Sequence, residues 1–167
     1  MVQHLLEGHA FLAGLSASQI QKLAALACEV SFSENEFVLH AGQQSRHFYL
    51  MLTGSVCVEV RGRGYTVMVQ AVGPGEAMGW SAFLDGHETL FQVRAREQCT
   101  ALCLDRDRLR ALLASDEALA AELLRRVLEV AAVRMHATEL ALGEMIGVKP
   151  RNEAKGVGTQ MNADERG

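Results

Sequence analysis

The chain has 167 residues, 49% of them hydrophobic, and a formal net charge of −4. This composition predicts a folded chain, and the length suits one domain with a sizeable core. Because 16 Lys and Arg stand against 20 Asp and Glu, the basic excess typical of nucleic-acid binders is missing. No apolar run reaches the ~18 residues of a membrane span, and residues 1–9 lack signal-peptide features. A cytoplasmic location without membrane contact is therefore predicted.

The first predicted elements are one helix and a series of short strands. Apolar residues recur at steps of three and four over residues 12–26, with Ser16 or Ser18 as the expected N-cap. From Glu29 the pattern changes to β runs, and the glycines of residues 61–64 predict a hairpin loop. Such strands are typical of an antiparallel barrel or sandwich. The runs cover residues 37–39, 48–52, 55–60, 65–69, 91–95 and 100–104.

Helical spacing returns after Asp105. It predicts a short helix over residues 105–113 and a longer one over about 116–142. The residues after Gly143 are polar and contain several glycines, and beyond Pro150 only Val157 and Met161 are bulky and apolar. Such a segment buries too little surface to offset its ordering entropy. We therefore expect a domain over residues 1–143 and a flexible polar tail over 144–167.

One segment carries a resemblance to a known family. Gly79-Trp80-Ser81-Ala82-Phe83-Leu84 follows Gly73-Pro74-Gly75-Glu76 at the predicted handover from a strand to a short helical turn. It resembles the phosphate-binding cassette of the cyclic-nucleotide-binding domains in the Crp/Fnr regulators, and motifs across residues 11–142 agree in order. The resemblance implies a mainly β fold with flanking helices: an antiparallel β-roll with one N-terminal helix and a long C-terminal dimerisation helix.

The resemblance also identifies candidate ligand contacts, and two positions depart from it. Trp80 stands where the family has a ribose-binding glutamate, and Thr89 where it has a phosphate-binding arginine. Strand alternation points Arg94 and Arg96 away from Thr89. Cyclic AMP binding is therefore expected to be weak or replaced by that of another small ligand. The candidate ligand contacts of the cassette are Gly79, Trp80, Ser81, Ala82, Thr89 and Leu90.

The long helix carries a heptad-like stripe, flanked by Leu124, Leu128 and Met135. We expect it to pack on the roll and on its twin in a parallel homodimer. Arg134 and Thr138 are polar positions at or beside the stripe, and each is a candidate contact to a ligand base or a partner chain. The alternative is a helix that covers only its own barrel. The stripe consists of Leu123, Val127, Val130, Arg134, Ala137 and Ala141.

Cysteine and histidine positions give little support to a metal site. The four cysteines form no Cys-x-x-Cys pair, and Cys99 and Cys103 share one face of a predicted strand. Reduced thiols packed in a β core are the favoured interpretation. Some relatives of this regulator class bind haem through a histidine, but surface or hydrogen-bonded roles are preferred for the candidate histidines. These are His40, His47, His87 and His136.

The sequence thus favours a non-catalytic ligand-sensing domain, because no nucleophile–base pairing or metal-spaced cluster is present. A protein-interaction and dimerisation module without a ligand is the first alternative, and a haem-based sensor is the second. Only 24 residues follow Gly143, which is too few for the winged helix-turn-helix domain of DNA-binding relatives. Direct nucleic-acid binding is therefore not expected, and output is expected to pass through a regulatory protein.

Overall fold

The computed structural model describes residues 1–84 and 88–147, and the strands and helices come in the predicted order. The strands are β1 (Ala27–Phe32), β2 (Phe37–Leu39), β3 (His47–Thr53), β4 (Val56–Arg61), β5 (Thr66–Val72), β6 (Ala77–Met78), β7 (Phe91–Ala95) and β8 (Cys99–Asp105). The helices are α1 (Val2–Glu7), α2 (Ala17–Ala24), α3 (Arg106–Ser115) and α4 (Glu117–Met145), with 3₁₀ turns η1 (Ala10–Leu12) and η2 (Trp80–Phe83). The predicted β-roll with flanking helices is confirmed.

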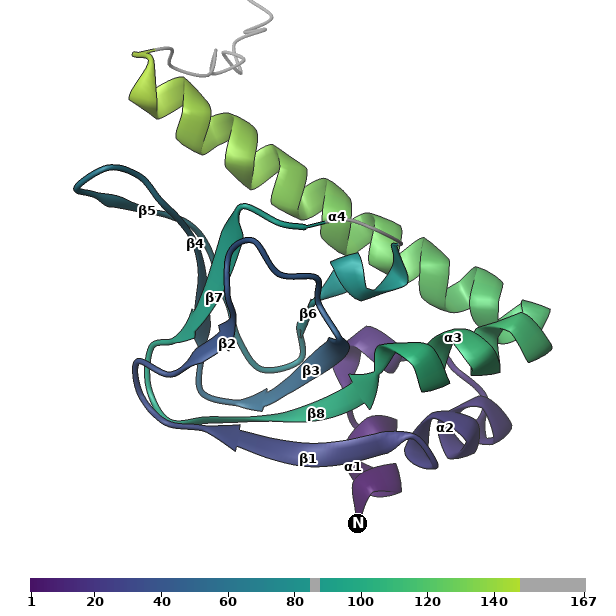
Figure 1. The fold of residues 1–167 in the computed structure, drawn as a ribbon. Helices are drawn as coiled ribbons and strands as arrows, with labels where there is room; N and C mark the ends of the chain where they lie inside the picture. Colours follow the sequence, from purple (N-terminus) through teal and green to yellow (C-terminus); the bar gives the residue numbers. More distant parts are fainter. Residues whose placement is uncertain (85–87, 148–167) are drawn as a thin grey trace, which may run out of the picture.

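The eight strands form two antiparallel sheets, in the orders β1-β8-β3-β6 and β2-β7-β4-β5. Figure 1 shows the helices gathered at one end of the sheets and α4 running along the roll beside η2. The predicted hairpin joins β4 to β5, where Gly64 has a φ of +83° and the Gly62 N–H donates to the carbonyl of Tyr65. This connection places β5 next to α4.

The N-terminal region differs from the single helix predicted over residues 12–26. It consists of α1, η1 and α2, because Gly14 takes a left-handed φ of +85° that interrupts the helix. Ser16 then starts α2 with a capping box: its Oγ accepts from the N–H of Gln19, and the Gln19 side chain accepts from the N–H of Ser16. The first of the two N-cap candidates is therefore the one used.

The C-terminal helices begin at the predicted aspartates. Asp105 caps α3, and Asp116 caps α4 through a 3.0 Å hydrogen bond from the Leu119 N–H. The long helix, however, continues through Gly143 to Met145, so residues 144 and 145 are helical rather than part of a flexible tail. The left-handed residue that follows its end is Gly147, with φ +76°. The rest of the predicted tail lies outside the described residues.

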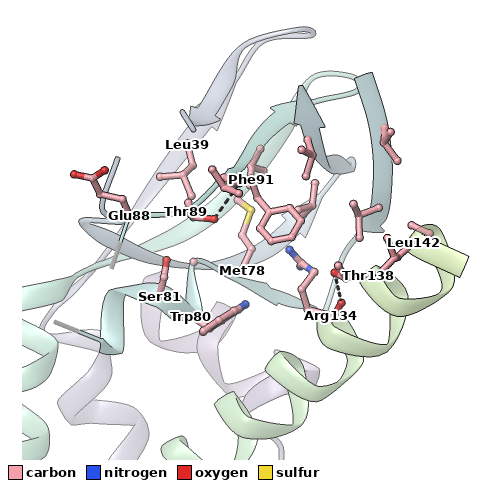
Figure 2. A pocket seen from close by; sticks show the side chains of 18 of the residues that line it. Leu39, Met78, Trp80, Ser81, Glu88, Thr89, Phe91, Arg134, Thr138 and Leu142 are labelled. Atoms are coloured by element: carbon pink, nitrogen blue, oxygen red, sulfur yellow. Dashed lines mark hydrogen bonds between the residues drawn. The ribbon is translucent and has the colours of Figure 1, made fainter. Parts of the chain in front are cut away.

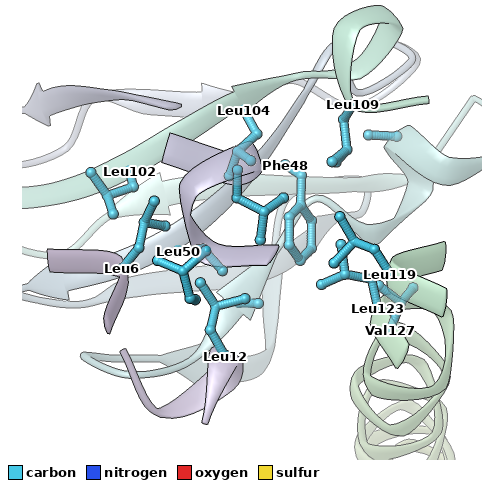
Figure 3. Packing of buried hydrophobic residues seen from close by; sticks show 14 residues of the cluster. Leu6, Leu12, Phe48, Leu50, Leu102, Leu104, Leu109, Leu119, Leu123 and Val127 are labelled. Atoms are coloured by element: carbon cyan, nitrogen blue, oxygen red, sulfur yellow. The ribbon is translucent and has the colours of Figure 1, made fainter. Parts of the chain in front are cut away.

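Two hydrophobic clusters hold the domain together. The first lies between the helices and the β1-β8-β3-β6 sheet; Figure 3 shows Phe48 beside Leu119 and Leu123 of α4, and Leu102 nearer Leu6 of α1. The second fills the space between the two sheets and includes Met51, Val58 and Val93. The N-terminal half of α4 is therefore part of the core of its own chain.

Cys99 and Cys103 share one face of β8 and lie in the second cluster, as the strand alternation predicts. Burial raises the pKa of Cys103 to about 12 and also raises the pKa values of Cys57 and Cys99. These three thiols are consequently protonated at neutral pH and act as small apolar side chains. Among the residues that the structure describes, no group of three or more His, Cys, Asp or Glu side chains is arranged to hold a metal.

Candidate functional site

The turn between β6 and η2 needs a glycine. Gly79 has a φ of +82°, and a Cβ atom there would lie 2.5 Å from the carbonyl oxygen of His47. That carbonyl already accepts a hydrogen bond of 2.7 Å from the Ser45 hydroxyl, so it is held in place. Both the conformation and the close approach exclude a side chain at residue 79. The turn directs the start of η2 towards the space between the sheet and α4.

A cavity of about 510 Å³ opens beside this turn. Its walls are the cassette segment, the inner face of the β2-β7-β4-β5 sheet and the C-terminal half of α4 (Figure 2). Most of the lining is apolar: it includes Val58 and Val60 of β4, Val67 and Val69 of β5, and Leu142 of α4. A concave space of this size and composition is typical of a small-molecule site.

Five of the six cassette residues predicted as ligand contacts line this cavity: Gly79, Trp80, Ser81, Thr89 and Leu90. Ala82 does not. Its side chain is 1% exposed in the first hydrophobic cluster, and its N–H donates to the carbonyl of Gly79 at 2.9 Å. Ala82 therefore faces the core, and its N–H is not available to a ligand because the Gly79 carbonyl already accepts it.

Trp80 and Phe83 leave the cavity open. The Phe83 ring packs edge-on against Phe48 with ring centroids 5.1 Å apart, inside the first cluster. Trp80 is half-buried and forms one wall. The Thr89 hydroxyl accepts from the Phe91 N–H at 3.0 Å. Among the described residues, the cassette side of the cavity therefore offers small polar groups and an indole ring, and no cation.

Arg94 lies on the outer face of its sheet, as strand alternation predicts. Its guanidinium donates to both carboxylate oxygens of Glu59, with distances of 3.0 and 2.9 Å, and to Asn35 at 2.8 Å. Glu59 is 3% exposed and also accepts from Gln92 at 2.7 Å. Hydrogen bonds from Arg94, with a further contribution from Gln92, lower the pKa of Glu59 to about 2. Arg94 is thus held by Glu59 and does not line the cavity.

The cation of the cavity comes from α4. Arg134 is 7% exposed, lines the cavity and donates from Nε to the Gln70 side chain at 2.5 Å. Burial lowers the pKa of Arg134, whereas the charge of Glu76 acts in the opposite direction; the group stays protonated at neutral pH. Thr138 also lines the cavity, and its hydroxyl donates to the carbonyl of Arg134 one turn earlier. The spacing of residues in the sequence did not predict the hydrogen bond between Arg134 and Gln70.

The predicted stripe of α4 packs on the roll of its own chain, which is one of the two contacts expected for it. Leu123 and Val127 are 2% and 7% exposed and belong to the first hydrophobic cluster, and Val130 packs against it. Ala137 is half-buried. Leu123, Val127 and Val130 therefore form the face of α4 that contacts the roll of the same chain. A charge at Leu123 or Val127 would therefore unfold the domain rather than separate two subunits.

Another stripe with the same spacing is exposed. Leu124, Leu128, Met135, Leu142 and Met145 follow heptad-related steps and are 48–69% exposed. Leu124 is one residue after Leu123 and so lies about 100° around the helix axis. The three residues that the sequence placed beside the stripe thus mark the apolar surface that α4 leaves open.

None of the described histidines lines the cavity. The His40 ring packs on Phe37 with centroids 5.0 Å apart, His47 lies 3.4 Å from the Tyr49 hydroxyl, and His136 is exposed beside Glu139. His87 lies outside the described residues. The sequence did not single out His9, which is buried and hydrogen-bonded to the Met51 carbonyl at 3.0 Å.

Comparison with known proteins identifies the family. The sequence model of the family described as "Cyclic nucleotide-binding domain" matches residues 29–116, which include the whole cassette. The chain belongs to this family. The resemblance predicted from the sequence is confirmed, and with it the general class of regulatory ligand-binding domains. A search of the curated proteins finds no match.

Solved structures of cyclic nucleotide-binding domains share the fold. A putative cyclic nucleotide-binding protein from Geobacter metallireducens GS-15 is 23% identical, with a TM-score of 0.70 over 81% of this chain and 99% of that chain. The N-terminal domain of a transcriptional regulator from Streptomyces coelicolor A3(2) is 24% identical, with a TM-score of 0.64 over 77% and 92% of the two chains.

A third similar structure carries a ligand. The regulatory subunit of a cAMP-independent protein kinase A from Trypanosoma cruzi, bound to guanosine, is 25% identical, with a TM-score of 0.60. The match covers 77% of this chain and 48% of that chain, so this chain spans about half of that protein. Within the described part of this chain, no helix is long and apolar enough to cross a membrane.

Proposed function

We propose that this cyclic nucleotide-binding domain is a non-catalytic sensor whose cavity binds a small molecule, and that cyclic AMP is at best a weak ligand. The observation that carries the proposal is a formed, open cavity whose cassette side has Trp80 and Thr89 in place of a carboxylate and a guanidinium. Arg94 offers no substitute because Glu59 holds it on the outer face of the sheet.

The size of the effect on cyclic AMP follows from the missing contacts. A charge-assisted hydrogen bond contributes about 1.5–3 kcal/mol, and each 1.4 kcal/mol changes the affinity about tenfold. A cassette without both the phosphate-binding arginine and the ribose-binding glutamate should therefore bind cyclic AMP about a hundredfold to ten-thousandfold more weakly. The guanosine-bound, cAMP-independent relative supports a ligand other than cyclic AMP in a domain of this kind.

The test is calorimetric titration of cyclic AMP into the wild-type chain and into a Trp80→Glu, Thr89→Arg double variant. Wild-type affinity should be weaker than micromolar, and the double variant should bind at least a hundredfold more tightly. Thr66→Arg is the control for the added arginine, because it places a guanidinium at an exposed position outside the cavity lining. Submicromolar binding by the wild type refutes the proposal, and unchanged affinity in the double variant refutes the cassette alignment.

The open cavity favours this proposal over the two alternatives from the sequence. In an interaction module with a decayed site, Trp80 and Phe83 would fill the pocket, whereas Phe83 packs in the core and Trp80 forms a wall. The haem-based sensor considered from the sequence holds haem through a histidine, and no histidine of the described residues lines the cavity. A Soret band in the purified protein would reverse this second preference.

We propose further that the domain forms a homodimer through the exposed stripe of α4. Leu124, Leu128, Met135 and Leu142 repeat with heptad-related spacing, and identical helices in parallel bury such a stripe. Leu128→Glu should yield monomers in light scattering without loss of thermal stability. Val133→Glu is the control, since Val133 is 57% exposed but lies on the opposite side of the helix from Leu124. A wild-type monomer at micromolar concentration contradicts the proposal.

A cytoplasmic location and an output through a partner protein, rather than through direct DNA contact, complete the proposal. The acidic balance of the chain supports the second point, because DNA binding depends on Lys and Arg contacts to phosphates. Gel-shift titration at physiological salt tests it: tight, sequence-dependent binding by this chain alone would overturn it. Fractionation of the native protein tests its location.

A further inference from the structure

Arg134 is a buried cation without an acidic partner. Its side chain is 7% exposed, and its one hydrogen bond within the described residues goes from Nε to the neutral side chain of Gln70. No acidic side chain of the described residues lies within ion-pairing distance of it, and Glu76, whose charge acts on it, instead accepts from the Gly73 N–H. A buried charge is costly unless it is paired. The pairing charge must therefore come from outside the described part of the chain.

The free end of the guanidinium faces the cavity. Figure 2 shows Arg134 reaching from α4 towards Phe91 and Met78, beside Thr138. Among the described residues, Arg126 Nε is the one fully buried side-chain nitrogen or oxygen without a hydrogen-bond partner. The two Nη atoms of Arg134 therefore keep some exposed surface, and Figure 2 shows the guanidinium directed into the cavity that Arg134 lines. A planar guanidinium with two free Nη atoms matches the two oxygens of a carboxylate.

The rest of the cavity suits an apolar body. Val58, Val60, Val67 and Val69 present four branched side chains from β4 and β5, and Trp80 adds an aromatic wall. The polar groups Ser81, Glu88 and Thr89 lie together on the other side of the view from Arg134 (Figure 2). Glu88 is the one carboxylate among the described lining residues, so a second anionic group on that side would be repelled.

From these observations we infer that the cavity binds an anionic amphiphile, a molecule with one carboxylate held by Arg134 and an aliphatic or aromatic body against the valines. The inference rests on the proposed function and specifies the ligand class of the same cavity. In this inference the group that binds the negative charge is Arg134 of α4, whereas in the resembled family it is an arginine of the cassette. A sugar phosphate is a poorer match, because its hydroxyl groups would lie unpaired against apolar side chains.

The test compares acids with neutral molecules of the same shape. Decanoate is paired with 1-decanol and naphthalene-2-carboxylate with 2-naphthamide, below the concentration at which decanoate forms micelles. Calorimetry gives the affinities. Trp80, the single tryptophan of the chain and part of the cavity wall, reports decanoate binding by its fluorescence. At least one acid should bind about ten- to a hundredfold more tightly than its neutral partner, the range of one charge-assisted contact.

Variants assign the effect to Arg134. Arg134→Gln should abolish the preference for the acid while leaving the affinity for the neutral molecule within about threefold. Arg125→Gln is the matched control: Arg125 lies on the same helix, is exposed, and pairs with Glu122 and Glu129 outside this cavity. Circular dichroism and thermal melting show whether each variant is folded. An unchanged preference in folded Arg134→Gln overturns the inference.

Further titrations with guanosine and cyclic AMP separate this inference from the proposed function. Binding of guanosine without binding of either acid overturns the inference and leaves the sensor proposal standing. Equal affinity for acids and neutral partners also overturns the inference, because Arg134 would then contribute nothing to recognition. Tight cyclic AMP binding overturns both. Absence of binding by every compound overturns the inference, since the cavity would then have no ligand of the proposed class, and it leaves the sensor proposal standing.

Discussion

Arg94 and Arg134 belong to the same domain but have opposite surroundings. Arg94 lies on the outer face of β7, a third of its side chain is exposed, and it forms an ion pair of 2.9 Å with Glu59. Arg134 lies on the inner side of α4 and is almost fully buried, and its side chain has only Gln70 as a hydrogen-bond partner in the described structure. The more exposed arginine is therefore the paired one.

This difference separates a structural charge from one that is available for binding. Glu59 is buried beneath Arg94, so the pair satisfies two charges within the sheet and stabilises the fold. The charge of Arg134 has no such function in the isolated domain and makes folding less favourable, because burial costs a cation part of its hydration. Because its burial makes folding less favourable, we interpret Arg134 as a residue that binds a ligand.

The largest expected effect tests this contrast directly. Arg94→Met leaves the buried Glu59 carboxylate without its cation and should lower the free energy of unfolding by about 3–5 kcal/mol. Arg134→Met removes an unpaired buried charge and should change it by less than about 1 kcal/mol, or raise it. Urea denaturation at neutral pH measures both. A loss of similar size in the two variants would mean that Arg134 is structural as well.

A somewhat smaller effect comes from pH. The pKa of Glu59 falls from 4.5 to about 2 on folding, so its stabilising contribution is fully present above about pH 4.5 and is lost as the pH falls towards 2. The contribution amounts to at most about 3 kcal/mol. Urea midpoints of the wild type and of Glu59→Gln should differ at pH 7 and converge near pH 2–3. A constant difference would show that Glu59 keeps its ordinary pKa in the folded state.

The smallest effect sharpens the account of Arg134. Gln70→Leu removes the acceptor that orients the guanidinium, a hydrogen bond of about 1 kcal/mol, and should weaken carboxylate binding about fivefold. The affinity for a neutral analogue should not change. Gln92→Leu is the control, because Gln92 contacts Glu59 outside the cavity. Equal losses for acid and neutral ligands would indicate that Gln70 shapes the cavity rather than positions Arg134.

The sequence predicted the fold and one side of the cavity well, because both depend on local rules. Glycines separate the strands, and the positive φ of Gly79 fixes the turn that leads to Trp80. Strand alternation also predicted that Arg94 points away from Thr89. The partner of Arg94 could not be predicted, since Glu59 meets it only through the register in which Glu59 pairs with Gln92 and Cys57 with Arg94.

For the long helix, sequence periodicity does not determine which face packs on the roll. Leu123 with Val127 and Leu124 with Leu128 both have a spacing of four, so periodicity alone does not decide which pair faces the roll. Only the packing of α4 on Phe48 and Leu50 makes that choice. The end of α4 was misplaced for a similar reason: Gly143 and Gly147 are alternative stops in sequence, and the left-handed conformation is taken by Gly147.

The anchoring of α4 at Arg126, nine residues after its first residue Glu117, gives it the geometry of a lever. Arg126 fixes the helix to the N-terminal segment by hydrogen bonds to the carbonyls of Phe11 and Ala13, at 3.1 and 2.7 Å. At 1.5 Å per residue, Arg134 lies about 12 Å beyond this pivot and Met145 about 28 Å beyond it. A straight helix that turns about Arg126 therefore converts a displacement of about 1 Å at Arg134 into about 2 Å at its tip.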